Sequence, residues 1–458
     1  MQLVSTTTGR LAFVVGLIVI VFSSTAQVNS PFSRYGIGNL AGANHIINRG
    51  MGGIQAAYSD GLSNNVGQSV NFNNPATYGS FYMISYDVAL TIDSRNLKSN
   101  NPSGSFSSIY FIPAYLTVGF PLNKAKGLGM AFGLKPISTI DYNISSRERR
   151  AGDSIGTNYE GNGGLNEAFI GIGKKWKNLH VGFNTGYRFG KKDLSTKKIF
   201  LNDTVAYNSS NSLSKTTIGG VFLHLGVQYE FSVLKVENKI TKSTQNYLLR
   251  FGGTANLKQN YNANQTQEVE TFSTSAIGSL VPIDSIYKQA NIKGTLTMPA
   301  TYEAGIVLHK TISNARGLFE LWSLGVEFTT TQWQNYRYYD KPDKALSNSW
   351  LLKIGGQISP NPQATRNYLN NVNYRFGVNF GKDYINADGN GLKTMSASFG
   401  AGFPIRKWRA YETQYTVLQT AFQFGKRGSS VNNITESFFQ FTFGFSLNDT
   451  WFIKRKYD

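Results

Sequence analysis

Hydrophobic and polar residues alternate along most of the chain after residue 80. In the first clear run, residues 82–93, aromatic and aliphatic side chains occupy every second position, whereas Asp87 and Asp93 belong to the opposite set. Successive side chains of a strand point to opposite faces, so one face is apolar and the other carries carboxylates that hydrocarbon would not accept. The run therefore predicts a membrane strand with one lipid face and one wet face.

The same alternation recurs often enough to predict a complete barrel. Candidate strands lie near 81–95, 109–120, 127–143, 166–175, 179–190, 216–232, 246–258, 299–310, 320–332, 349–359, 370–385, 393–405, 413–426 and 436–447. They number about fourteen, an even number, as in single-chain bacterial barrels. A soluble β-sandwich would also alternate, but its apolar faces must fill one shared core. Because nearly every run is long, we favour an all-β fold, a transmembrane antiparallel β-barrel whose last strand pairs with the first.

The connections between these runs give an independent indication of topology. Long connections alternate with short ones, as external loops alternate with periplasmic turns in such barrels. We expect external loops at 144–165, 191–215 and 259–298, and both barrel ends in the periplasm. The connection near 233–245 is longer than a turn, which indicates that a strand boundary is misplaced there.

The N-terminus carries an export signal. Arg10 precedes an uninterrupted apolar run at 11–22, and small residues at 24–26 offer a cleavage site. The alternative is a membrane anchor, but roughly 12 apolar residues fall short of the ~20 that span hydrocarbon. We therefore predict a signal peptide at 1–26 and export to the outer membrane of a Gram-negative bacterium. Because the remaining chain has no such run, membrane insertion must use strands.

Residues 27–80 do not follow the strand pattern. They are rich in glycine, asparagine and serine, yet they also contain aromatic and aliphatic residues that argue for burial. The alternatives are a disordered periplasmic tail and a plug folded into the lumen, of which we favour the plug. The barrel would then span 81–447, and a basic periplasmic tail at 448–458 would act as an interface anchor or a docking element.

Composition excludes several classes of function. The chain has no cysteine, so disulfides, thiolate metal sites and cysteine nucleophiles are absent. Its four histidines have no metal-ligand spacing, and no nucleophile stands out, so we expect no metal, no cofactor and no enzyme. The net charge of +19 is scattered and lacks nucleic-acid-binding motifs. Outer-membrane lipid, lipopolysaccharide or acidic protein partners are the expected contacts instead.

Charged residues also fall on the predicted lumen faces, and they carry both signs. A selectivity ring would show one sign, so we expect these charges to pair with one another and with the plug. The residues are Asp87, Glu230, Arg250, Glu303, Glu327, Lys353 and Arg375.

Two short motifs in the predicted plug resemble those of the FadL-like family of outer-membrane transporters. The first is Arg49-Gly50-Met51-Gly52-Gly53, and the second is Asn74-Pro75-Ala76. The sequence departs from the family pattern at Gly50, where alanine is common, and in a longer spacer between the motifs. The resemblance implies a fourteen-stranded barrel with these residues in an N-terminal hatch. It also implies passive uptake of hydrophobic small molecules.

Two prolines interrupt consecutive predicted strands. Pro113 lies inside one strand, where it removes a ladder donor, and Pro136 is expected to end the next. A break of this kind is either a bulge near the rim or a gap in the wall, and FadL-like transporters are thought to release hydrophobic cargo through such a gap. We state a lateral opening at these residues as a hypothesis beside the bulge.

Two functions remain open at this point. The first is passive uptake, with a hydrophobic ligand or a detergent-like molecule held in the lumen. The alternative is a non-transporting accessory barrel in an outer-membrane secretion or barrel-assembly complex. Uptake predicts a continuous apolar pocket behind the hatch, whereas an accessory subunit predicts a filled lumen and contacts with other proteins.

Overall fold

A computed structural model describes residues 30–42, 44–60, 68–150, 153–201, 208–240, 242–274, 280–315, 317–362, 366–387, 389–405 and 415–449. The predicted signal peptide, residues 406–414 and residues 450–458 of the predicted tail lie outside the described residues. No helix among the described residues is long and apolar enough to cross a membrane.

Fourteen antiparallel strands form a closed barrel, as the alternation predicts. In order around the wall they are β2 (Ile84–Asn100), β3 (Ser103–Asn123), β4 (Leu128–Arg150), β5 (Asp153–Trp176), β6 (Leu179–Phe200), β7 (Ser209–Asn238), β8 (Ser243–Asn256), β11 (Thr301–Asn314), β12 (Gly317–Thr331), β15 (Ser349–Ile358), β16 (Asn373–Lys382), β17 (Lys393–Ile405), β18 (Tyr415–Arg427) and β19 (Ile434–Asp449). We call the end where β2 begins and β19 ends the entry end, because the chain enters the barrel wall there. The opposite end is the far end.

The barrel closes where the last strand pairs with the first. The β19–β2 ladder runs from Ile434 opposite Ser99 to Asp449 opposite Ile84. Phenylalanines on the outer face of β19 stack on those of β18, with the rings of Phe422 and Phe441 centred 4.8 Å apart. This pairing removes the two edges that the sheet would otherwise expose.

The three segments expected to be external loops are strands instead. β4 and β5 have 23 and 24 residues, and β7 has 30, far more than the 9–11 or so that span a bilayer. Within 259–298, β9 (Gln259–Thr274) and β10 (Leu280–Met298) pair as an antiparallel hairpin, and β9 pairs with the first part of β7. Outside the membrane a strand has no lipid face, so its alternation weakens although its ladder continues.

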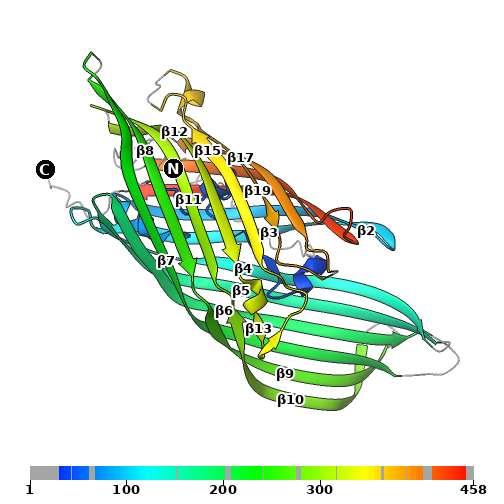
Figure 1. Cartoon of the computed structure of the whole chain (residues 1–458). Helices are drawn as coiled ribbons and strands as arrows, with labels where there is room; N and C mark the ends of the chain where they lie inside the picture. Colours follow the sequence, from blue (N-terminus) through cyan, green and yellow to red (C-terminus); the bar gives the residue numbers. More distant parts are fainter. Residues whose placement is uncertain are drawn as a thin grey trace, which may run out of the picture.

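The hairpin and the ends of β4–β7 form one sheet beyond the far end of the barrel, which we call the extension sheet. In Figure 1 it sweeps away from the shorter strands β8, β11, β12 and β15. The strand boundary that the sequence misplaced near 233–245 lies at Asn238, where β7 ends. A short turn then leads to β8 at Ser243.

The described residues of 30–80, which we call the N-terminal segment, lie inside the barrel. They contain η1 (Pro31–Arg34), β1 (Asn39–Leu40), α2 (Ile46–Gly50) and η2 (Pro75–Ser80). The side chains of Ile47, Val70 and Tyr78 have no exposed surface. The main hydrophobic core of the molecule therefore lies in the lumen, between this segment and the wall.

Connections at the far end close over the N-terminal segment. The link between β12 and β15 contains η3 (Trp333–Asn335), β13 (Arg337–Tyr338) and β14 (Lys341–Pro342), whereas η4 (Tyr368–Asn371) follows β15 at the entry end. Trp333 stacks on Tyr384 with ring centroids 4.5 Å apart. The hydroxyls of Tyr336 and Tyr384 donate hydrogen bonds to the carbonyls of Gly36 and Gly38.

Candidate functional site

The wall is split between β3 and β4, and this split defines the candidate site. The ladder between the two strands covers only Leu116–Asn123 and Leu128–Leu134. Farther from the entry end, β3 stays paired with β2, and β4 stays paired with β5. The two strands therefore part from about the middle of the wall onward.

β4 turns inward where it leaves β3. Its Ser138 and Thr139 pair with Leu40 and Asn39 of β1, inside the barrel. The Ala41 amide also donates to the carbonyl of Ile137, at 3.0 Å. The N-terminal segment thus takes the place of β3 as the partner of β4.

Pro113 and Pro136 both lie at the point where the strands part. The β3 register shifts against β2 next to Pro113, and the β4 register shifts against β5 next to Pro136. Each proline lacks the N–H that a continuous ladder would use. The expectation that Pro136 ends its strand is wrong, because β4 continues to Arg150 once the shift has re-established pairing with β5.

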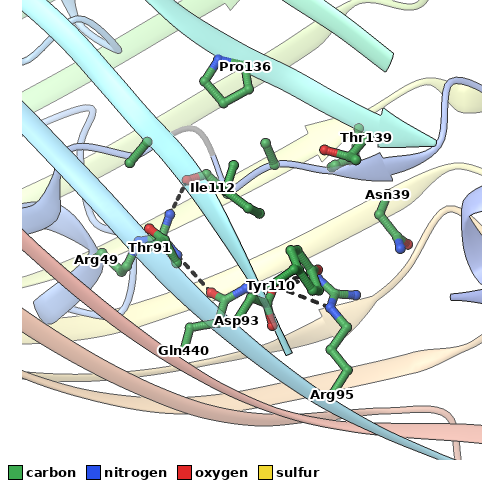
Figure 2. Close-up of a pocket in the computed structure, with 14 residues that line it drawn as sticks. Asn39, Arg49, Thr91, Asp93, Arg95, Tyr110, Ile112, Pro136, Thr139 and Gln440 are labelled. Atoms are coloured by element: carbon green, nitrogen blue, oxygen red, sulfur yellow. Dashed lines mark hydrogen bonds and ion pairs between the residues drawn. The ribbon is translucent and has the colours of Figure 1, made fainter. Parts of the chain in front are cut away.

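A pocket lies behind the split, with a cavity volume of about 30 Å³ inside a hollow of about 480 Å³ that includes open solvent. Figure 2 shows its lining, to which β2, β3, β4, β19 and the N-terminal segment contribute. The polar part is formed by Arg49, Thr91, Asp93, Arg95, Tyr110, Thr139, Asn39 and Gln440. The apolar part is formed by Leu40, Ala41, Ile112, Ala114 and Pro136.

Most charges in the pocket are neutralised by neighbours. Arg95 contacts Asp93 at 2.9 Å and Glu436 at 2.7 Å. Asp93 also accepts hydrogen bonds from the Tyr110 hydroxyl, at 2.8 Å, and from the Gln440 amide, at 2.7 Å. This network fixes the polar wall of the pocket and joins β2, β3 and β19.

Arg49 is the exception in this network. It projects from the last turn of α2 and donates to the Gln440 side chain at 2.7 Å and to the carbonyl of Gly42. Among the described residues no carboxylate lies within 4.0 Å of it, and its Nε has no partner. Burial lowers the pKa of Arg49 below its ordinary value, an effect that Asp93 opposes. An arginine stays charged even so, and the pocket therefore holds one buried cation with neutral partners.

The first predicted motif, residues 49–53, lies against strands β15–β19. The Gly52 amide donates to the Ser398 hydroxyl at 2.9 Å. Gly52 and Gly53 have φ values of +71° and +91°, a left-handed conformation that favours glycine. Met51 is buried against the wall, and a Cβ on Gly50 would meet Gly400 at 3.1 Å.

The second predicted motif opens η2 on the other side of the lumen. Asn74 caps this helix by accepting from the Ala76 amide at 3.1 Å, and its own amide donates to the Val227 carbonyl at 3.3 Å. Pro75 follows at the first helical position, where its missing N–H costs nothing. The two motifs therefore hold opposite sides of the segment against the wall.

The predicted lumen charges contact the N-terminal segment or one another. Glu327 accepts hydrogen bonds from the amides of Gln55 and Ala56, at 2.7 and 2.6 Å. Lys353 lies 2.7 Å from Glu327. Glu303 accepts from the Gln55 side chain at 2.8 Å.

The remaining lumen charges behave in the same way, except for Arg375. Asp87 accepts from the Val70 amide at 2.6 Å. Arg250 pairs with Glu230 and donates to the Ser59 carbonyl at 3.1 Å. Arg375 donates to the neutral side chains of Gln357 and Gln419, at 2.6 and 2.7 Å.

Sequence reasoning missed several residues of the pocket. Arg95 lies on the predicted wet face of the first strand, but its partner Glu436 and the pocket residue Gln440 belong to β19, about 340 residues away, and only barrel closure brings them together. The described residues contain no cluster of three histidine or acidic side chains that could hold a metal ion.

Three solved structures have a similar fold at low sequence identity. The TodX toluene transporter of P. putida matches with a TM-score of 0.51 and 12% identity, over 89% of this chain and 98% of that one. A Pseudomonas aeruginosa FadL homologue matches with a TM-score of 0.50 and 12% identity, over 89% and 98%. The Ralstonia pickettii toluene transporter TbuX gives 0.50 and 13%, over 88% and 97%. The predicted FadL-like fold is thereby supported.

Comparison with whole sequences gives a more specific result. No curated protein matches the chain. A family model described as BamG matches residues 10–458, a family that the two motifs did not indicate. The chain belongs to the BamG family.

Proposed function

We propose that the protein is a passive transport barrel of a Gram-negative outer membrane. In this proposal a small hydrophobic molecule, with at most one anionic group, moves between the pocket and the lipid through the split between β3 and β4. The observation that carries the proposal is the end of the β3–β4 ladder at Leu116 and Leu134, directly beside the pocket.

The position of the split supports a route into lipid. Ile109 and Phe111 are 54% and 48% exposed, so β3 carries lipid-facing side chains along the parted stretch. Unpaired backbone groups in hydrocarbon cost several kcal/mol each. A wall opening at this depth is therefore tolerated only where it lines a cavity, as it does here.

The pocket lining supports the choice of cargo. Ile112, Ala114 and Pro136 form an apolar strip at the split, and Arg49 lies deeper, with neutral hydrogen-bond partners. An apolar molecule can occupy the strip alone, and a carboxylate at its end can pair with Arg49. Two proteins of the same fold are named as toluene transporters, which agrees with the apolar part of this lining.

The proposal is tested with two probes, octanoate and toluene, on the purified full chain and on three variants. Arg49→Gln should weaken octanoate binding by about tenfold or more, since it removes a charge-assisted pair, and should leave toluene binding unchanged. Ala114→Trp should block both probes by filling the pocket. Ala290→Trp, at an exposed position of β10, is the matched control and should change neither.

Binding is measured by titration calorimetry, and transport by radiolabelled uptake into vesicles that contain the barrel. If the unaltered protein binds neither probe, or if Ala114→Trp and Ala290→Trp behave alike, the pocket is not the transport site.

A second candidate function has its own supporting observation. The N-terminal segment fills the lumen and is bonded to both sides of the wall, through Glu327 and through Asn74. A filled lumen and a large extension sheet suit an accessory barrel that binds other proteins of an outer-membrane complex. Purification in a mild detergent at native abundance separates the candidates, because stoichiometric protein partners without a bound small molecule would favour the accessory role.

A further inference from the structure

A groove rich in lysine lies at the entry end, apart from the pocket at the split. Two turns form it, one between β3 and β4 and one between β5 and β6, together with the exit of the N-terminal segment at Phe81 and Tyr82. The groove is open to solvent and has a volume of about 790 Å³. Its lysines are Lys124, Lys126, Lys175 and Lys177, and Lys174 lies beside it.

The two turns are held together, so the groove has a defined shape. The Lys175 amide donates to the Gly127 carbonyl at 2.8 Å, and the ammonium of Lys174 contacts the Lys126 carbonyl. A Cβ on Gly79 would meet the Lys175 backbone nitrogen at 2.5 Å, which shows how closely the N-terminal segment packs there. The lysines are thus gathered by backbone contacts rather than by acidic partners.

These lysines lack the ion pairs that other charged residues of the protein have. Among the described residues, no carboxylate lies within 4.0 Å of any of the five. Three exposed lysines elsewhere, Lys191, Lys235 and Lys288, do have such a pair, at 3.0, 2.6 and 3.1 Å from a carboxylate. The groove therefore gathers several positive charges that have no carboxylate in direct contact.

The outer surface next to the groove is apolar and lipid-facing. Ile172, Lys174 and Trp176 follow one another on the outer face of β5. Ile172 is 38% exposed and Trp176 is 54% exposed. The Lys174 ammonium lies 5.8 Å from the centre of the Trp176 ring. Leu122 and Phe132 continue the apolar surface on β3 and β4, at 46% and 45% exposure. This change from apolar to aromatic and basic residues marks the interface between hydrocarbon and headgroups.

We propose that the groove binds the phosphate headgroup of an anionic glycerophospholipid in the membrane leaflet at the entry end. The lysines hold the phosphate, and the acyl chains lie along Leu122, Phe132 and Ile172. An acidic protein segment would be drawn to the same charge, but it would not use the adjoining lipid-facing surface. A lipid is favoured because the basic groove adjoins the apolar surface of Leu122, Phe132 and Ile172, so one molecule can contact both.

The test uses the full chain in a nonionic detergent, incubated with equal amounts of phosphatidylglycerol and phosphatidylcholine that carry the same acyl chains. Native mass spectrometry then counts the lipids retained. We expect the protein to retain phosphatidylglycerol over phosphatidylcholine by about tenfold or more, since each interfacial lysine contributes about 1 kcal/mol toward an anionic surface. The triple variant Lys124→Gln, Lys126→Gln, Lys177→Gln should lose that preference.

The matched control is Lys191→Gln, Lys235→Gln, Lys288→Gln, which removes the same net charge from exposed lysines outside the groove. It should keep the preference, and a heat-induced shift on gels confirms that both variants are folded barrels. Equal retention of the two lipids by the unaltered protein would overturn the proposal. So would equal loss in both variants, or displacement of the lipid by inorganic phosphate or by a polyglutamate peptide at millimolar concentration.

Discussion

At the scale of single residues, glycines of the wall let the N-terminal segment pack closely against the strands. Gly252 of β8 faces the lumen, and a Cβ there would overlap the Ala56 carbonyl, whereas a Cβ on the neighbouring Gly253 would meet only Val227 and Glu303, at 3.5 and 3.7 Å. The two positions share one strand and differ in the face to which they point. They offer a direct comparison of a packed position with an open one.

We predict that Gly252→Ala lowers the free energy of unfolding by about 2 kcal/mol, because overpacking must displace the segment or the strand. Gly253→Ala should stay within about 0.5 kcal/mol of the unaltered protein. Chemical denaturation in detergent measures both, and limited proteolysis reports whether residues 44–60 have become accessible. Equal effects of the two variants would show that the segment does not press on Gly252.

A second prediction at this scale concerns Glu327 and Lys353, which are both buried and 2.7 Å apart. Glu327→Gln or Lys353→Met alone should cost about 3–5 kcal/mol, since each leaves a buried charge without its nearest oppositely charged partner. The double variant should cost less than the sum of the two by more than about 1 kcal/mol. Strict additivity in the denaturation midpoints would mean that the two groups do not interact.

At the scale of elements, the parting of β3 from β4 has a measurable consequence. The backbone of Ser103–Ala114 on the side of β4 has no described ladder partner, whereas β2 is paired on both sides. We predict that amides of this stretch that point toward β4 exchange with solvent or detergent-phase water faster than those of Leu116–Phe120. Hydrogen exchange with mass spectrometry checks this, and uniform protection along β3 would contradict it.

The N-terminal segment should respond to pH through Asp60. Burial raises the pKa of Asp60 to about 6, although hydrogen bonds from Ser69 oppose the shift. Because the pKa is higher in the folded than in the unfolded state, stability is greatest below the unfolded value and falls as pH rises from about 4 to 6. We expect a loss of about 3 kcal/mol across this range, measured by exchange protection of residues 68–80. Asp60→Asn should remove the dependence.

The elements also show how much of the fold could be predicted from the sequence. The wall strands were predictable because a lipid face and a wet face impose alternation, as in β19, where Phe439 and Phe445 are exposed and Thr442 is buried. The extension sheet was missed because both of its faces are polar, so residues 144–165 and 191–215 resemble loops. The pocket could not be predicted in full, since it combines residues of β2 and β19 that only closure brings together.

At the scale of the whole molecule, the ring of fourteen strands does not require the β9–β10 hairpin. β8 pairs with β7 on one side and with β11 on the other, and Asn256 lies opposite Thr301. The hairpin instead extends the sheet from the first part of β7. The barrel and the extension sheet are therefore separable in principle, although Tyr261 and Leu296 of the hairpin are buried in the lumen core.

We predict that joining Asn256 to Thr301 through an Asn-Gly turn, with residues 257–300 removed, leaves a folded barrel of lower thermal stability. The turn suits a two-residue hairpin. A heat-induced gel shift should persist, with a lower midpoint because the core loses Tyr261 and Leu296. Removal of β17 and β18, which are ring strands, is the control and should abolish the shift. Loss of the shift in both deletions would show that the hairpin belongs to the ring.

The bonds of the N-terminal segment dictate an order of assembly. Ser30 bonds to Glu436 across 406 residues of sequence, and Arg49 bonds to Gln440 across 391. The N-terminal segment is synthesised first, but it cannot form these bonds until β19 is in place. Contacts between residues so far apart in the sequence form slowly. We therefore expect the N-terminal segment to reach its final position in the same step in which β19 pairs with β2. Until β19 pairs with β2, the hydrophobic residues of the lumen core have no complete wall around them, so any chaperone that binds the chain must cover them.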